Sequence, residues 1–239
     1  MDFILRQTAL LDLSLYPPLF SIDDRSNIFS MNQAPIVKRR RGRPPKHLSA
    51  FSETKAQLIR AGMEILTEKG FSATGIDEIL KSIGVPKGSF YHYFESKNDF
   101  GMELINSYDL FLKGKLNRFL DDQSLSALDR LAAFIHDAEE SMRRHEFKRG
   151  CLIGNLGQEM GKLPEEFRSR LVQVFQDWET SVELCLKEAQ LEGSISQKHN
   201  CATLAYVFWT GWEGAVLRAK LERSPKPLRE FSRFYLENL

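Results

Sequence analysis

A polar and aromatic stretch just after Pro86 carries side chains that suit contacts with a nucleic acid. Serine and histidine can hydrogen-bond base edges, while lysine and the tyrosine hydroxyl suit phosphate oxygens. Glycine lets the backbone approach a ligand closely. The residues expected to contact DNA in this stretch are Lys87, Gly88, Ser89, Tyr91, His92 and Tyr93. For Tyr93, half-buried packing is the alternative.

A thiol lies in a second segment, the glycine-rich and apolar sequence GCLIGNLGQ. Cys151 can add to an electrophile as a thiolate, and the preceding Lys148 and Arg149 would lower its pKa. Asn155 and Gln158 add amide groups that can bind a ligand. The alternative is that the cysteine is a small buried hydrophobe. No lysine–serine pair follows, so the segment is not a phosphate-binding loop.

Three tryptophans and one acid farther along the chain are candidates for the walls of a ligand pocket. Indole N–H groups or a buried cation would meet the carboxylate of a small acid. Tryptophans at helical spacing are often core residues, so packing is the alternative. The pocket candidates are Trp178, Trp209, Trp212 and Glu213.

The chain lacks the residue sets that catalysis or metal binding needs. No nucleophile has a matching base, no Cys/His cluster has zinc spacing, and no dinucleotide fingerprint is present. Cys151, Cys185 and Cys201 are too few for a disulfide framework, which favours the cytoplasm. No apolar run approaches the roughly 20 residues of a membrane-spanning helix. We therefore expect no enzyme, no cofactor, no metal and no membrane partner.

Helices must position the DNA-contacting stretch. An amphipathic helix is expected to begin with Ser52 as its N-cap and to end at Gly70. Thr74 would cap a second helix, Gly84 makes the turn, and Pro86 takes the first position of a third helix. Two helices joined by a tight turn commonly place one helix in a DNA groove.

The remainder of the chain is also expected to be helical. Hydrophobic residues make up 42% of the sequence and recur at three- and four-residue spacing, which predicts an all-α fold of about nine helices. Phe90 and Phe94, four residues apart, should face the core. Long helices are expected from Phe100, from Pro164 and from Cys201, the last with small residues that suit a close helix–helix contact.

A basic arm, KRRRGRPPK at 38–46, precedes the first helix and holds six of the 33 basic residues. Without these six, the chain carries 27 basic and 32 acidic residues, so positive charge is concentrated in the arm. Glycine and proline keep the arm extended, and Arg41 and Arg43 are therefore candidates for a DNA minor groove. A solvated tail or a non-specific phosphate anchor is the alternative. Met31 offers an alternative translation start after a disordered N-terminal stretch.

The pattern between Ser52 and Lys97 resembles the TetR family of bacterial regulators, except at Pro86, where many members carry a serine. The matching residues are Gly70-Phe71, Thr74, Ile79, Gly84-Val85, Lys87 to Tyr91, Phe94 and Ser96-Lys97. The chain is expected to begin with a disordered extension over 1–50. The resemblance implies a three-helix helix-turn-helix domain over 51–98 and a larger ligand-binding and dimerisation domain over 99–239. It also implies DNA contacts from Thr74 and Lys97, the latter to a backbone phosphate.

Two later segments, KRGCLIGNLGQEMGKLPEEFRSRL and FWTGWEGAVLRAKLERSPKPL, resemble regulators of acrylate and dimethylsulfoniopropionate utilisation. The glycine-cysteine-leucine step is also similar to the electrophile-sensing repressor of N-ethylmaleimide reductase. The resemblance implies a homodimeric repressor on a pseudo-palindromic double-stranded operator, released by a small effector such as acrylate or a related electrophile. The alternatives are a thiol-based redox or electrophile sensor with another effector, an all-α enzyme with an accessory DNA-binding module, and a sequence-indifferent architectural DNA binder.

Overall fold

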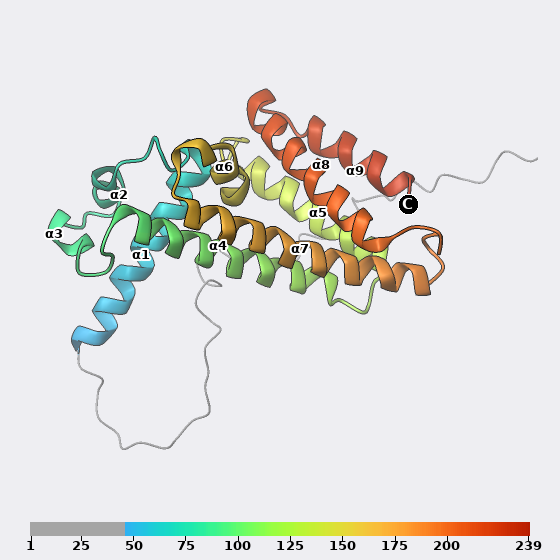
Figure 1. Ribbon diagram of the computed structural model, residues 1–239, viewed down its shortest axis with the longest axis horizontal. Coiled ribbons are helices and arrows are strands. Elements are labelled where there is room, and N and C mark those ends of the chain that lie inside the picture. Colours follow the sequence, from blue (N-terminus) through green and yellow to red (C-terminus); the bar gives the residue numbers. More distant parts are fainter. Residues whose placement is uncertain (1–45) are drawn as a thin grey trace, which may run out of the picture. The chain divides into compact units, whose positions relative to one another are not determined.

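The computed structural model describes residues 46–239, with side chains from residue 53 onward, and this part of the chain contains nine α-helices, one short 3₁₀ helix and no strand (Figure 1). The helices are α1 (Lys46–Lys69), α2 (Ile76–Ser82), α3 (Lys87–Phe90), α4 (Lys97–Leu120), α5 (Ala127–Arg144), α6 (Leu152–Gln158), η2 (Met160–Lys162), α7 (Glu165–Leu191), α8 (Cys201–Glu222) and α9 (Lys226–Glu237). The predicted all-α fold is confirmed. The N-terminal extension, the alternative start and the arm with Arg41 and Arg43 lie outside the described residues, apart from the last residue of the arm.

The first helix starts earlier than predicted, at Lys46 instead of Ser52. The sequence from Lys46 to Ser52 contains no glycine or proline, so nothing in it stops the helix. Proline is tolerated at a helix start and disrupts a helix interior, so the Pro44-Pro45 pair is the natural N-terminal limit. At the other end Gly70 adopts φ +84°, and α1 ends there as predicted.

Three phenylalanines fasten the short α3 to the rest of the bundle. Phe90 and Phe94 are buried as predicted, with ring centroids 5.2 Å apart, and Phe94 lies 4.7 Å from Phe100 of α4. Gly62 of α1 makes room for this cluster, because a Cβ there would lie 2.5 Å from the Phe100 ring. The position of α3 is therefore set by aromatic packing against α1 and α4.

The long helix α4 begins beside α1 and runs to the opposite end of the bundle, packed against α5 and α7 (Figure 1). Helix α8 packs on α7 and on α9. The expected close contact at the small residues of α8 is present, because a Cβ on Gly211 would lie 2.3 Å from the Phe231 ring of α9. Helix α4 thus provides a continuous link between the α1–α3 end and the C-terminal helices.

Candidate functional site

The segment after α2 contains most of the predicted DNA-contacting side chains. They lie on the short helix α3 and on the turns that follow it. Helix α3 comprises only Lys87–Phe90, and beyond it the chain forms tight turns in which His92 N–H donates to the Ser89 carbonyl and Tyr93 N–H to the Phe90 carbonyl. The expected third helix is therefore shorter than predicted. The buried phenylalanines on either side of the turn leave Tyr91 55% exposed and His92 exposed as well.

The polar side chains of α3 are available at its surface. Lys87 is exposed and forms an ion pair of 3.0 Å with Asp77 of α2, which is also exposed. Such a surface pair is worth little, so a phosphate can replace the carboxylate. Gly88 is exposed, and Ser89 and Tyr93 are half-buried.

Two of the predicted DNA contacts point inward instead. Thr74 is 1% exposed, its hydroxyl donates to the Gly70 carbonyl over 2.6 Å, and the N-cap of α2 is Gly75, so the predicted cap is wrong. Lys97 does begin α4, but its ammonium donates to the Phe71 carbonyl over 2.7 Å and lies 4.5 Å from the Phe71 ring centroid. Burial lowers the pKa of Lys97. Both side chains donate to backbone carbonyls, Thr74 just after the end of α1 and Lys97 in the loop that follows.

The thiol of Cys151 lies at the N-cap of α6 with its side chain 9% exposed. Its neighbours are the Glu213 carboxylate of α8 and the Tyr108 hydroxyl of α4. Burial, followed by the negative charge of Glu213, raises the pKa of Cys151 well above its ordinary value.

The basic residues just before the thiol do not activate it. Lys148 pairs with Glu146, and Arg149 pairs with Glu64 over 3.4 Å. The prediction that these cations lower the pKa of Cys151 is therefore wrong, because their charges are directed to acids elsewhere.

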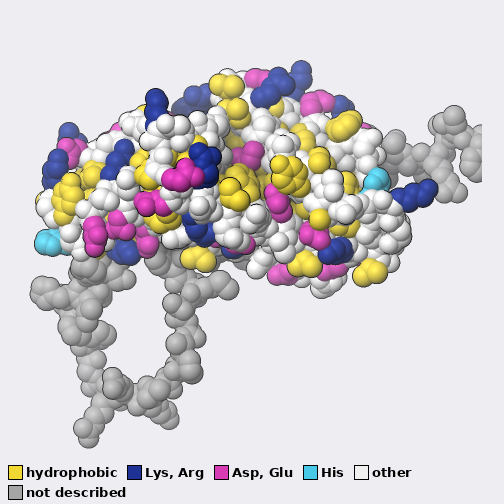
Figure 2. All heavy atoms as spheres, viewed as in Figure 1, with side chains coloured by type: hydrophobic (Ala, Val, Ile, Leu, Met, Phe, Trp, Pro, Cys, Tyr) yellow, Lys and Arg dark blue, Asp and Glu magenta, His cyan; other side chains and the backbone are white. Residues whose placement is uncertain are grey.

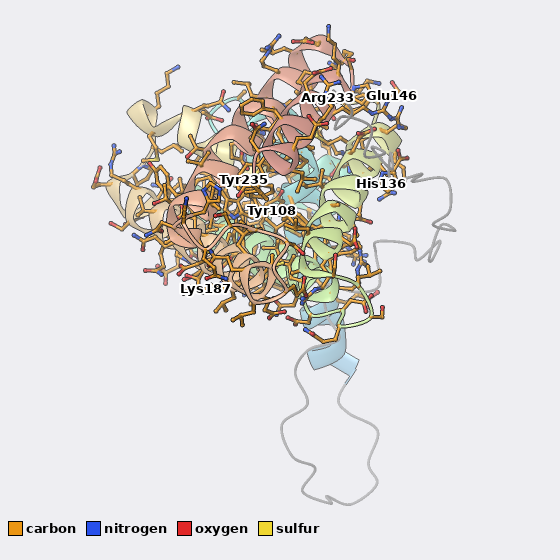
Figure 3. All side chains as sticks on the ribbon, turned by 90° about the vertical axis from the view of Figure 1, so that its right-hand side faces the viewer. Tyr108, His136, Glu146, Lys187, Arg233 and Tyr235 are labelled. Carbon is orange, nitrogen blue, oxygen red and sulfur yellow. The ribbon has the colours of Figure 1, made fainter. Side chains whose placement is uncertain are left out.

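The Glu213 carboxylate occupies the centre of this cluster. Burial raises the pKa of Glu213 to about 7, an effect that the neighbouring Cys151 thiol partly offsets. Its Oε1 is buried and has no hydrogen-bond partner among the described residues. Its Oε2 presses against α6, since a Cβ on Gly154 would lie 2.0 Å from it. Figure 3 shows Tyr108, the third member of the cluster, among the helices of the bundle.

The three tryptophans have different surroundings. Trp178 is buried and donates its indole N–H to Asp109 over 2.9 Å. Trp209 is 2% exposed, its ring lies 5.0 Å from that of Trp178, and its N–H has no partner among the described residues. Trp212 stacks on Phe208 with an interplanar angle of 8° and packs toward α9. The structure thus brings Trp178 and Trp209 together, and it places Glu213 one turn beyond Trp209 on α8.

Asp109 was not among the predicted site residues. Besides the indole of Trp178, this buried carboxylate binds Arg170 of α7 over 2.7 Å and Lys113 over 3.0 Å. The group is fully satisfied and ties α4 to α7. The sequence signal for it is weak, because one aspartate in a long amphipathic helix usually faces solvent.

The two amides predicted to bind a ligand do not face the thiol. The Asn155 side chain donates to the Leu66 and Thr67 carbonyls of α1, over 3.1 and 2.9 Å. Gln158 is exposed and donates to the Gly154 carbonyl within α6. Asn155 is therefore a link between helices, and Gln158 lies on the outer side of α6.

Asn155 belongs to a group of side chains that hold the end of α1, which we call the α1 clasp: Asn155, Glu159 and Lys220. The Lys220 ammonium donates to the Thr67 and Glu68 carbonyls, over 3.0 Å each. The Glu159 carboxylate accepts from the backbone N–H groups of Phe71 and Ser72, over 2.9 and 2.7 Å. Neither Glu159 nor Lys220 was predicted as functional, because the sequence places their partners 87 to 153 residues away.

The described residues contain no helix long and apolar enough to cross a bilayer. They also contain no group of three or more His, Cys, Asp or Glu side chains arranged to hold a metal ion.

Comparison with known proteins finds family matches in both the N-terminal and the C-terminal part of the described chain. Residues 58–100 match the family described as bacterial regulatory proteins, tetR family, and residues 127–235 match the tetracyclin repressor-like C-terminal domain. The chain is 52% identical over 206 residues to the transcriptional regulator AcuR of Cereibacter sphaeroides, which covers 86% of this chain and 92% of that protein. The chain belongs to the TetR family. It is a DNA-binding transcriptional regulator with a helix-turn-helix.

Other relatives agree with this assignment. The repressor NemR of Escherichia coli is 31% identical over 183 residues, covering 74% of this chain and 88% of NemR. The crystal structure of regulatory protein TetR from Rhodobacter sphaeroides has 53% identity and a TM-score of 0.75, covering 76% of this chain and 96% of that one. The reduced form of E. coli NemR has 28% identity and a TM-score of 0.71, covering 77% and 95%. The residues 58–100 that match the family include α2 and α3.

Proposed function

We propose that this TetR-family chain is a cytoplasmic homodimeric repressor that binds a pseudo-palindromic operator and leaves it when a small effector binds. The observation that carries DNA recognition is the exposed Tyr91 and His92 on a turn held by buried Phe90 and Phe94. In a homodimer, the two copies of this turn would be related by a twofold axis and would reach successive major grooves. Lys87, Gly88, Ser89 and Tyr93 add the remaining contacts, and Arg41 and Arg43 stay predicted minor-groove contacts.

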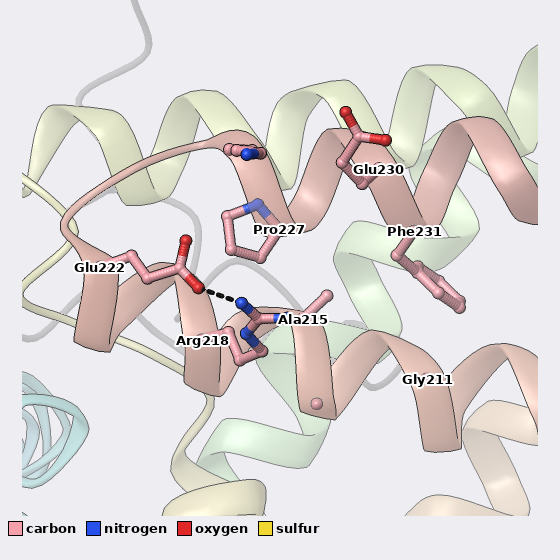
Figure 4. A pocket seen from close by; sticks show the side chains of 9 residues that line it. Gly211, Ala215, Arg218, Glu222, Pro227, Glu230 and Phe231 are labelled. Carbon is pink, nitrogen blue, oxygen red and sulfur yellow. Dashed lines mark hydrogen bonds and ion pairs between the residues drawn. The ribbon is translucent and has the colours of Figure 1, made fainter.

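An apolar outer surface on α8 and α9 supports dimerisation through a second copy of this chain. The large exposed side chains on these two helices are Tyr206, Val207, Leu217, Leu221 and Phe234. Figure 2 shows hydrophobic side chains over this part of the molecule. Figure 4 shows the neighbouring hollow between α8 and α9, which the Arg218–Glu222 ion pair of α8 lines on one side. Because the patch lies on both helices of one subunit, a twofold axis would pair it with itself.

The effector is proposed to enter between α4, α6 and α8, beside Glu213. The proposed effector is a small acid such as acrylate, or a related electrophile, and the buried Glu213 Oε1 and Trp209 Nε1, which lack partners among the described residues, support this position. We favour reversible binding over covalent capture, because the Cys151 thiol is buried and its pKa is raised. Covalent capture would form a bond from sulfur to the β-carbon of acrylate and move the thiol proton to the α-carbon.

The α1 clasp supports a route from this site to the DNA. Asn155 is on the same short helix that Cys151 caps, and Lys220 is on the same helix as Glu213. Both donate to carbonyls at the end of α1. A ligand that separates α6 from α8 would therefore shift α1, and with it α2 and α3. In the proposed dimer, this shift would change the distance between the two copies of α3.

Fluorescence anisotropy with promoter DNA from beside its own gene tests the proposal. We expect a specific shift over a random duplex at physiological salt, and its reversal by acrylate. Equal affinity for random DNA would favour a sequence-indifferent architectural binder. A Cys151→Ser variant that still releases DNA with acrylate would exclude the covalent route.

A further inference from the structure

Within residues 46–239, two polar atoms on one face of α8 are buried and have no hydrogen-bond partner. They are the indole Nε1 of Trp209 and the carboxyl Oε1 of Glu213. Residues four apart lie one above the other on a helix, so both groups face the same side. Native cores leave few polar atoms unsatisfied, and each such atom costs stability unless something else binds it.

The groups around Glu213 are neutral hydrogen-bonding groups. From α6 it is faced by the Cys151 thiol and from α4 by the Tyr108 hydroxyl. Burial raises the pKa of Cys151 and of Tyr108 well above their ordinary values, so both stay protonated at neutral pH. Glu213 is therefore the group of this cluster that changes charge near pH 7.

The nearby cations are committed to other partners. Lys113 and Arg170 bind the Asp109 carboxylate, over 3.0 and 2.7 Å. Lys220, two turns beyond Glu213 on α8, donates to carbonyls of α1. A carboxylate ligand placed here would meet the charge of ionised Glu213 with no free cation from these three residues to offset it.

We propose that the Trp209 N–H and a protonated Glu213 carboxyl form a pair of neutral donors for the oxygen atoms of a small carboxylate or carbonyl ligand. An anionic ligand then binds with the uptake of one proton by Glu213. The inference rests on the proposed effector response and specifies how the effector head group is recognised.

A change in pH distinguishes the two ligand classes. Acrylate is an anion across the neutral range, so its affinity should fall by up to about tenfold per pH unit once Glu213 ionises. Acrylamide has the same number of heavy atoms as acrylate and carries no charge. Its amide N–H can donate a hydrogen bond to an ionised carboxylate. Its affinity should change less than threefold over the same range.

The test is isothermal titration calorimetry of the full-length protein with acrylate and with acrylamide at about pH 6 and about pH 8.5, with protein mass checked for adducts. Glu213→Gln keeps the shape and a donor without the charge, and should bind acrylate equally at both pH values. Glu183→Gln on α7, which only loses its ion pair with Lys187, is the matched control and should behave like the wild type. Trp209→Phe should weaken both ligands about tenfold.

Measurements of operator binding distinguish a failure of the proposed donor pair from a failure of the proposed repressor function. If wild-type protein releases operator DNA with acrylate but its acrylate affinity is the same at both pH values, the donor pair is refuted and the repressor stands. If neither ligand binds at either pH, the donor pair is refuted as well. If specific operator binding itself is absent, the proposed function fails. Should Glu213→Gln not fold, the wild-type contrast between acrylate and acrylamide still decides.

Discussion

Lys220 of α8 and Thr67 of α1 are 153 positions apart, yet the lysine ammonium donates to the threonine carbonyl over 3.0 Å. The same carbonyl accepts from Asn155 and from the backbone N–H of Gly150. The end of α1 is thus held by α8 and by the segment around α6 at a single point.

Lys220→Met keeps the apolar stem and removes two hydrogen bonds to the end of α1. We expect a loss of about 1–3 kcal/mol in the free energy of unfolding, since a charged donor leaves two carbonyls. The acrylate concentration needed for DNA release should shift several-fold. The change in operator affinity without acrylate should be smaller than this shift. Urea denaturation and anisotropy measure the two effects. Lys187→Met, which removes an exposed lysine from an ion pair within α7, is the control and should change neither.

Tyr91→Ala and His92→Ala should each weaken operator binding about 5- to 30-fold, as expected for a lost base or phosphate contact of about 1–2 kcal/mol. Both side chains are exposed, so thermal stability should stay within about 2 °C of the wild type. Thermal melts and anisotropy give the two readouts. Unchanged operator affinity would remove these residues from the interface.

Thr74→Val changes a predicted DNA contact whose side chain is buried in the fold. The buried hydroxyl that bonds to the Gly70 carbonyl is lost, so stability should fall by about 1–2 kcal/mol. Specific and non-specific DNA affinity, measured where the variant is fully folded, should match the wild type. A selective loss of operator binding would restore Thr74 as a DNA contact.

Glu213 should make the protein less stable as pH rises. Its pKa is 4.5 as an ordinary carboxyl and about 7 in the fold, so the folded state holds the proton more tightly. Below about pH 4.5 both states are protonated and there is no effect; between about pH 4.5 and 7 stability falls, by at most about 3 kcal/mol at pH 8. Glu213→Gln should therefore gain stability relative to wild type at pH 8 and much less at pH 5, as measured by urea denaturation. An equal difference at both pH values would contradict the raised pKa.

The Cys151 thiol should react slowly with iodoacetamide at pH 7.5, at least about tenfold more slowly than an exposed cysteine peptide, because the protein holds it buried and protonated. Glu213→Gln should speed the reaction by removing the negative charge beside it. Mass spectrometry of the Cys151 peptide follows the rate. Rapid labelling of the wild type would revive the covalent route.

Local patterns in the sequence determined most of the helices and the position of the recognition segment. Four-residue spacing is enough to bury Phe90 and Phe94 on one side, and a glycine is enough to end α1 at Gly70, because both effects act within a turn of helix. The start of α1 was missed by six residues, since Ser52 resembles a cap but nothing upstream of it breaks the helix before Pro45.

The tertiary structure alone decided which charges and hydrogen bonds meet. Along the chain Cys151 has cationic neighbours, whereas in space it is buried and lies beside the carboxylate of Glu213. Burial, followed by the charge of Glu213, raises the pKa of Cys151 instead of lowering it. Lys97 and Asn155 have the right chemistry for a phosphate or a ligand, yet they bond to carbonyls 26 and 88 residues away. Contacts over such separations depend on how helices pack, and helical periodicity reports which face is buried without saying what it is buried against.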